Sequence, residues 1–237
     1  MRTLTTCRTG GLGLDPGATF SLGSGAGADP VAVAANRRRL RARLALPGEP
    51  VWLQQEHGTQ VVELSAGQIP EQPPVADAAV TQEPGVVGAI LTADCLPVVL
   101  AADDGSAAAL AHAGWKGLAA GVIEAALAAL PVAPTRLHAW LGPAIGPAAF
   151  EVGPEVRAAF LATDPAHAES FRAGAGDRWF ADLYGLARRR LHVAGVRSID
   201  TGAWCTYRDR RRFFSHRRDQ GHTGRMVTLA WIDPHAS

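Results

Sequence analysis

Val86-Val87-Gly88-Ala89-Ile90-Leu91-Thr92 is a short apolar run bounded by turn-forming residues. Two further runs follow it, Leu96-Pro97-Val98-Val99-Leu100 and residues 107–111, and residues 137–141 add a fourth. Apolar runs of this length between turn signals are typical of buried β-strands. The middle of the chain is therefore predicted to supply four strands of the core.

Helical patterns lie before, between and after these strands. Residues 30–46 carry apolar side chains among Ala and Arg, which predicts a helix with an Arg-rich outer face. Residues 118–130 are Ala-rich with apolar side chains at helical spacing, and Pro131 ends this segment. Residues 154–162 and 182–194 predict two more helices. Because helices and strands mix without strict βαβ alternation, we expect an α+β fold with a mixed or antiparallel sheet.

The length and composition are those of a globular protein. The chain has 237 residues, of which 47% are hydrophobic and 19% charged, enough for one large domain or two small ones. Residues 21–30 and 65–76 are rich in turn-forming residues and are predicted to be loops. Neither loop is long enough to tether separate domains, so we expect a single domain over residues 1–237.

Charge and cysteine content narrow the class of protein. A formal net charge of +1 gives no general attraction to nucleic acid or to an anionic membrane. Cys7, Cys95 and Cys205 are too few and too scattered for a disulfide framework, which favours a reducing compartment. The N-terminus lacks the apolar stretch of a signal peptide, and no run approaches the ~20 apolar residues of a membrane span. We therefore expect a cytoplasmic protein with no membrane partner.

Three residues in short, Gly-punctuated segments have the chemistry of a metal site. His57, Cys95 and His112 offer two imidazoles and a thiolate, which suit a borderline-soft ion such as zinc. Three protein ligands leave one coordination position free, as in catalytic sites. Their separations of 38 and 17 residues match no zinc finger, so the fold must assemble the site. Taken alone, a buried Cys is more often a small apolar residue, and a lone His a hydrogen-bonded one.

Cys95 and His112 lie near the ends of successive predicted strands, which would place them side by side in an adjacent-strand arrangement. Asp94 precedes Cys95, and it can share a pocket with Cys95 only if the strand has ended there, because strand neighbours point to opposite faces. A competing interpretation makes Cys95 a nucleophile activated by His112, as in a cysteine hydrolase. That interpretation leaves His57 without a role.

Cations occur at two places where an anion could bind. Lys116, the only lysine, follows a Gly-Trp pair at a predicted strand-to-helix turn, where backbone N–H groups could assist it. Residues 215–225 gather Arg217, Arg218 and Arg225 around a turn. This segment fits bidentate phosphate recognition and fits a solvated polar loop equally well. No dinucleotide or P-loop glycine motif is present.

Six motifs, in order along nearly the whole chain, resemble those of the YfiH family. They are Gln55-x-His57-Gly58, Asp77-Ala78-x-Val80-Thr81 with Pro84-Gly85, Thr92-Ala93-Asp94-Cys95-Leu96-Pro97, His112-Ala113-Gly114-Trp115-Lys116-Gly117, Gly142-Pro143-Ala144-Ile145-Gly146-Pro147 with Phe150-Glu151-Val152-Gly153, and Ser215-x-Arg217-Arg218-Asp219 with Thr223-Gly224-Arg225. Members of this family have been named both laccase-domain polyphenol oxidases and purine nucleoside phosphorylases.

The resemblance implies an α/β sandwich of mixed sheets flanked by helices, and a metal-dependent enzyme. Family members are described as phosphorolysing adenosine, inosine, guanosine and methylthioadenosine, and as deaminating adenosine. Their His-Cys-His metal site corresponds here to His57, Cys95 and His112. The expected partners are therefore purine nucleosides and phosphate, with a monomer or a weak homo-oligomer as the assembly.

We accordingly interpret the chain as a zinc-containing purine nucleoside phosphorylase with adenosine deaminase and methylthioadenosine phosphorylase activity. Lys116, Arg217, Arg218 and Arg225 are candidates for binding phosphate, and Asp94 is a candidate proton carrier. The alternatives are a copper-dependent polyphenol oxidase, the cysteine hydrolase and a non-catalytic metal-binding protein. Laccase chemistry needs several coppers and many His-x-His ligands, whereas this chain has 8 His and no His-x-His.

Overall fold

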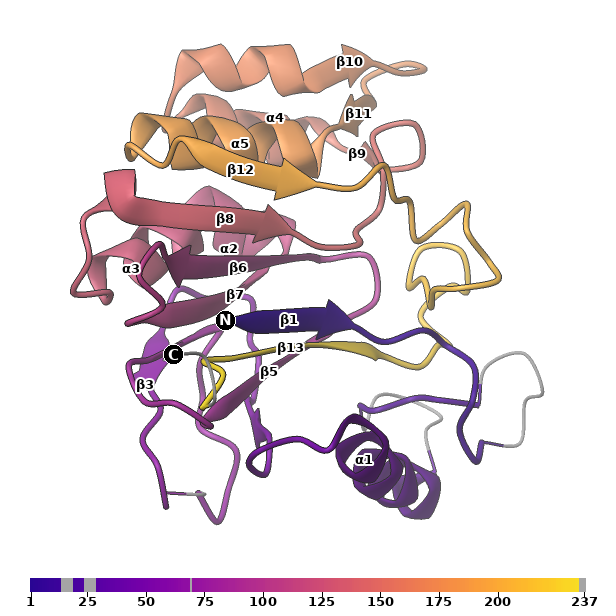
Figure 1. Cartoon of the computed structure of the whole chain (residues 1–237). Helices are drawn as coiled ribbons and strands as arrows, with labels where there is room; N and C mark the ends of the chain where they lie inside the picture. The colour runs from indigo at the N-terminus through magenta and orange to yellow at the C-terminus, as the bar shows by residue number, and fades with distance from the viewer. Residues whose placement is uncertain (14–18, 24–28, 69, 235–237) are drawn as a thin grey trace.

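The computed structural model describes residues 1–13, 19–23, 29–68 and 70–234. Its larger sheet has six strands in the order β12-β8-β6-β7-β4-β3 (Figure 1). Their bounds are β3 Val61–Glu63, β4 Ala78–Thr81, β6 Leu96–Ala102, β7 Ala108–Ala113, β8 Leu137–Leu141 and β12 Ser198–Thr201. The pairs β12-β8 and β3-β4 are parallel and the other three are antiparallel, so this sheet is mixed.

A second mixed sheet has four strands in the order β1-β13-β5-β2. These strands are β1 Arg2–Thr5, β2 Val51–Trp52, β5 Val87–Thr92 and β13 Met226–Trp231. A small antiparallel sheet, β10-β11-β9, contains β9 Glu151–Val152, β10 Phe171–Ala173 and β11 Trp179–Ala181. The four strands predicted in the middle of the chain are confirmed, although β5 belongs to a different sheet from β6, β7 and β8.

Five α-helices lie among the described residues. They are α1 Pro30–Leu44, α2 Trp115–Ala120, α3 Val122–Ala128, α4 Pro154–Leu161 and α5 Leu183–Val193, with short 3-10 helices at Pro134–Arg136 and Pro165–Ser170. The predictions for α1, α4 and α5 are confirmed within two residues at each end. The helix predicted over residues 118–130 is instead two helices, because Gly121 at φ 102 interrupts it. A positive φ is accessible to glycine without steric cost, which makes this break possible.

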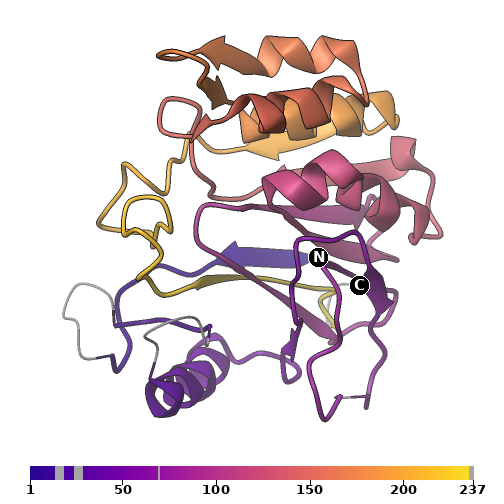
Figure 2. The ribbon, with the colours of Figure 1, turned by 180° about the vertical axis from the view of Figure 1, so that it is seen from behind.

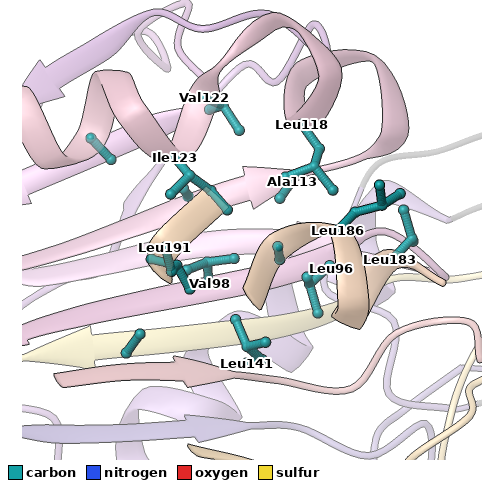
Figure 3. Packing of buried hydrophobic residues seen from close by; sticks show 14 of the residues in the cluster. Leu96, Val98, Ala113, Leu118, Val122, Ile123, Leu141, Leu183, Leu186 and Leu191 are labelled. Atoms are coloured by element: carbon teal, nitrogen blue, oxygen red, sulfur yellow. The ribbon is translucent and has the colours of Figure 1, made fainter. Parts of the chain in front are cut away.

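The helices and the two large sheets stack as layers. Along β6, Leu96, Val98 and Leu100 pack with α2, α3 and α5, whereas Val99 packs with the second sheet. This alternation follows from the period of two along a strand. Figure 3 shows Val98 and Leu141 facing Ile123 and Leu191. On the outer face of the second sheet, α1 contributes Leu40 to a third cluster, so the α/β sandwich is confirmed (Figures 1 and 2).

The predicted loops fall partly outside the described residues, at positions 24–28 and at 69, and their described parts contain neither helix nor strand except for the first residue of α1 at Pro30. No helix in the described part of the chain is long and apolar enough to cross a membrane.

Candidate metal centre and its cavity

Three metal-ligating side chains converge at one end of the β6-β7 pair. His57 follows β2, Cys95 lies in the turn between β5 and β6, and His112 lies in β7. One ligand atom from each residue lies within 4.8 Å of the other two. The two imidazole rings meet edge to face, with centroids 4.7 Å apart. The fold thus brings together the three residues that the sequence predicts as ligands, and two nitrogens with one sulfur fit a zinc-like ion.

The register of β6 and β7 explains this convergence. Leu96 pairs with Ala113, so Cys95, one residue before β6, comes beside Gly114, one residue after β7. A Cβ atom on Gly114 would lie 2.6 Å from Nδ1 of His57 and 3.0 Å from Sγ of Cys95. The ligand atoms therefore occupy the space that any other residue at position 114 would need.

Asp77, for which the sequence predicted no role, fixes the imidazole of His112 and the backbone of the loop that carries His57. Its carboxylate accepts hydrogen bonds from the backbone N–H groups of Glu56, His57 and Gly58 at 3.0, 3.0 and 2.6 Å. These bonds support the loop in which His57 adopts a φ of 61. Nδ1 of His112 lies 2.7 Å from the same carboxylate, which leaves Nε2 of His112 for a metal ion.

The ionisable groups of this cluster shift one another's pKa values. Burial alone would lower the pKa of His112, but the Cys95 sulfur and the Asp77 carboxylate raise that pKa to about 9. For Asp77, burial opposes ionisation, and the bonds from His112, Gly58 and Glu56 outweigh it and lower the pKa. Burial lowers the pKa of His57, and the neighbouring His112 lowers it further. His112 and Asp77 thus form a charge-assisted pair in the protein alone.

Gln55 ties the loop that carries His57 to the end of β5. Its Nε2 donates to the carbonyl of Leu91 at 2.8 Å, and its Oε1 accepts from the N–H of Leu91 at 2.8 Å. The sequence signal for these two residues was weak. Gln55 precedes the candidate ligand His57 by two residues, and Asp77 directly precedes the buried strand β4.

A cavity of about 750 Å³ opens beside the metal cluster. Its wall includes the three candidate ligands and Asp94, together with side chains from the distant segments 145–156 and 216–225. Phe150, Glu151 and Arg178 also line the cavity, and the sequence predicted no individual role for them. Glu151 and Arg178 pair at 3.5 Å at the cavity. The volume falls within the range of small-molecule binding sites.

Two of the four predicted phosphate-binding cations line this cavity. Arg217 donates from Nη1 to the carbonyl of Glu151 at 2.6 Å. Arg225 donates from Nη1 to the carbonyls of Thr223 and Gly224 at 3.0 and 3.1 Å. Burial lowers the pKa of Arg225, and the nearby Cys95 and Asp94 offset part of this effect.

The other two predicted phosphate-binding cations, Arg218 and Lys116, lie outside the cavity wall. The Arg218 side chain is 6% exposed and pairs with Asp219 at 2.8 Å. It also donates to the carbonyls of Thr206, Tyr207 and Phe213, so it braces the loop from inside. Lys116 is exposed on α2, with Nζ 5.9 Å from the ring of Trp115. Neither side chain lines the cavity.

Asp94 lies beside Cys95 in the cavity wall, as the sequence analysis required for a shared pocket. The β5 strand ends at Thr92 and β6 begins at Leu96, so Asp94 and Cys95 are outside regular strand geometry. The carboxylate of Asp94 accepts hydrogen bonds from two hydroxyl groups and one backbone N–H.

A family model and curated relatives both match nearly the whole chain. A family model described as "Multi-copper polyphenol oxidoreductase laccase" matches residues 2–233. A protein of Xylella fastidiosa named "Purine nucleoside phosphorylase" is 49% identical over 97% of this chain and 91% of its own length. "Purine nucleoside phosphorylase YfiH" of Escherichia coli is 47% identical over 95% of this chain and 91% of its own length.

Solved structures share the fold. The crystal structure of a Neisseria meningitidis protein superimposes with a TM-score of 0.91 at 43% identity, covering 98% of this chain and 93% of that one. The crystal structure of YlmD from Geobacillus stearothermophilus superimposes with a TM-score of 0.90 at 31% identity, covering 98% of this chain and 92% of that one.

Proposed function

This chain belongs to the family described as multi-copper polyphenol oxidoreductase laccase, and we propose that it is a zinc-dependent purine nucleoside phosphorylase, the name that its relatives from Xylella fastidiosa and Escherichia coli carry. It would cleave adenosine, inosine, guanosine and methylthioadenosine with phosphate, releasing the base and a ribose 1-phosphate, and would also deaminate adenosine. The observation that carries this proposal is one cavity that joins a His-Cys-His donor set to two arginines.

The donor set supports the choice of metal. His57, Cys95 and His112 would hold the ion, with Asp77 fixing the tautomer of His112. Zinc accepts this mixture of nitrogen and sulfur and would supply Lewis-acid chemistry when bound. Gly114 supports the same assignment, because it provides the room that the crowded ligand atoms need.

Phosphate would bind to Arg217 and Arg225. Within the described residues, Nη1 of Arg217 donates to one main-chain carbonyl and Nη1 of Arg225 donates to two, and the other N–H groups of both guanidinium groups have no protein acceptor. Such a held guanidinium is ready to bind an oxyanion through two parallel bonds. Its task in phosphorolysis is to place phosphate near C1′ of the ribose, where the bond to the purine breaks. The cavity has room for a nucleoside together with this second substrate.

A cysteine hydrolase is the second candidate, and one observation favours it. Cys95, His112 and Asp77 form a chain of contacts in the order nucleophile, base and orienting carboxylate. That chemistry does not use His57, whereas the metal-dependent proposal requires it. The polyphenol oxidase in the family description has less support. His57, Cys95 and His112 form the one three-donor group found among the described residues, and laccase chemistry needs several coppers.

The test compares metal content and base release in wild-type protein and in three single variants. Cys95→Ala and His57→Ala should each lose bound zinc and release no base from adenosine or inosine, with or without phosphate. Cys205→Ala is the matched control, because Cys205 is also half-buried but does not line the cavity. Retained turnover in His57→Ala with loss in Cys95→Ala would favour the hydrolase. Normal zinc content and turnover in Cys95→Ala would refute the proposal.

A further inference from the structure

Asp94 connects the candidate ligand Cys95 to the loop that carries Arg217. Its backbone has a φ of 88, in the left-handed region that residues other than glycine rarely adopt, and the residue is only 8% exposed. A conformation of this kind persists only where surrounding contacts hold it, and it is often found at functional sites. The contacts of Asp94 are therefore informative about its role.

Three hydrogen bonds reach the Asp94 carboxylate from residues more than 100 positions later in the chain. Thr206 Oγ1 donates to Oδ1 at 2.5 Å, and Ser215 Oγ donates to Oδ2 at 3.0 Å. The backbone N–H of Arg217 donates to Oδ2 at 2.7 Å. All three donors belong to the loop between β12 and β13, which crosses the end of both large sheets (Figure 1).

Arg217 is consequently held at both ends. Asp94 binds its backbone N–H, and the carbonyl of Glu151 accepts from its guanidinium at 2.6 Å. Ser215 strengthens the first contact, because its hydroxyl oxygen also accepts from the N–H of Arg218 at 3.2 Å. The position of the Arg217 guanidinium in the cavity thus depends on a carboxylate that the guanidinium itself does not touch.

We propose that Asp94 is a positioning residue that holds the Arg217 loop against the metal centre so that Arg217 can bind phosphate. This inference rests on the proposed function, because it takes phosphate as the anion in the cavity. It also differs from the proton-carrier role considered for Asp94. A proton carrier must exchange its proton with the substrate, whereas Oδ2 of Asp94 already accepts two hydrogen bonds from the protein and Oδ1 accepts one from Thr206.

Variants of the two hydroxyl donors distinguish a positioning role of Asp94 from a proton-transfer role. Thr206→Val and Ser215→Ala each delete one donor and leave the carboxylate unchanged. Each should raise the Kd for inorganic phosphate, measured by calorimetry on zinc-loaded protein, by at least about fivefold, the scale of one lost hydrogen bond of ordinary net strength. The KM for phosphate should rise in parallel, and zinc content should stay within about twofold of wild type, since neither hydroxyl is a ligand.

Thr81→Val is the matched control, because the Thr81 hydroxyl is also buried and donates to the carbonyl of Leu64 at 2.9 Å, and neither residue lines the cavity. It should leave the phosphate Kd unchanged.

Asp94→Gly is the second test, since glycine adopts φ 88 without strain and lacks the carboxylate. It should weaken phosphate binding at least as much as Thr206→Val does. In an Arg217→Ala background, Thr206→Val should add no further loss, because its effect acts through Arg217.

The outcomes distinguish the inference from the proposed function. Wild-type phosphate affinity in Thr206→Val, Ser215→Ala and Asp94→Gly would overturn the positioning role. The same result with abolished turnover in Asp94→Gly alone would assign proton transfer to Asp94. If phosphate binds and these variants weaken it, but wild-type protein releases no base from any purine nucleoside, the positioning role stands and the phosphorylase proposal fails.

Discussion

Asp77→Asn is expected to destabilise the protein and to weaken its metal binding together. Oδ1 of Asp77 accepts from the backbone of His57 and pairs with Nδ1 of His112, and Oδ2 accepts from Glu56 and Gly58. Asparagine keeps one acceptor oxygen and replaces the other with an NH₂ group. In either orientation that NH₂ group faces two donors, so two hydrogen bonds are lost and donor opposes donor.

The magnitude follows from these two bonds. Each lost bond to an ionised partner costs about 1.5–3 kcal/mol when the group is buried, and the loop at residues 56–58 is only partly buried. We therefore expect the free energy of unfolding of the metal-free protein to fall by about 2–4 kcal/mol. Zinc affinity should fall by about 10–100-fold, because the tautomer and orientation of His112 are no longer fixed.

The assay is urea denaturation of chelator-treated protein, followed by zinc titration against a competing chelator. Asp103→Asn is the matched control, since Asp103 pairs with Arg136 on the exposed surface at 2.8 Å. That control should change neither the unfolding midpoint nor the zinc affinity beyond error, as is usual for exposed ion pairs. Wild-type stability and zinc affinity in Asp77→Asn would refute the assignment of Asp77 as the residue that orders the metal centre.

Three further predictions concern the same cavity. Gly114→Ala should lower zinc affinity by about tenfold or more, because its methyl group would sit 2.6 Å from Nδ1 of His57, and competition titration measures this loss. Cys95→Ala should abolish zinc retention while the thermal unfolding of chelator-treated protein stays close to wild type, since Cys95 is only half-buried; a collapse of that transition would contradict a purely ligating role. Arg217→Ala or Arg225→Ala should raise the KM for phosphate or lower phosphorolysis by about tenfold, or roughly 1.4 kcal/mol, and should affect adenosine deamination much less. Equal loss of both activities would mean that these arginines shape the pocket instead.

Much of the fold was predictable because its signals are local. The apolar runs at β6 and β8 are bounded by turns, and Pro30 and Pro154 each begin a helix at the first helical position, where proline is tolerated. The assignment of β5 to a second sheet was not predictable, because strand pairing depends on long-range partners such as β13. The break at Gly121 was also missed, since an isolated glycine is compatible with a helix until its φ is known. The expectation of one domain over residues 1–237 stays a prediction.

At the site, the ligand chemistry was predictable from the sequence, whereas the contacts that support the ligands were not. His57, Cys95 and His112 were selected from their ligand chemistry and their places near strand ends, and the fold brings them together. Asp77 was missed because its role depends on hydrogen bonds to a loop 19 to 21 residues earlier. Arg217 and Arg218 are neighbours with the same chemistry, and only the path of the loop places one at the cavity and the other inside the protein.

The most direct measurement of the central claim is product analysis of inosine turnover by zinc-loaded protein across a range of phosphate concentrations. We predict that hypoxanthine and ribose 1-phosphate form in equal amounts, that their rate rises with phosphate to saturation, and that chelation stops both and added zinc restores both. Release of hypoxanthine with free ribose, at a rate independent of phosphate, or full phosphorolysis after complete removal of zinc, would contradict the account.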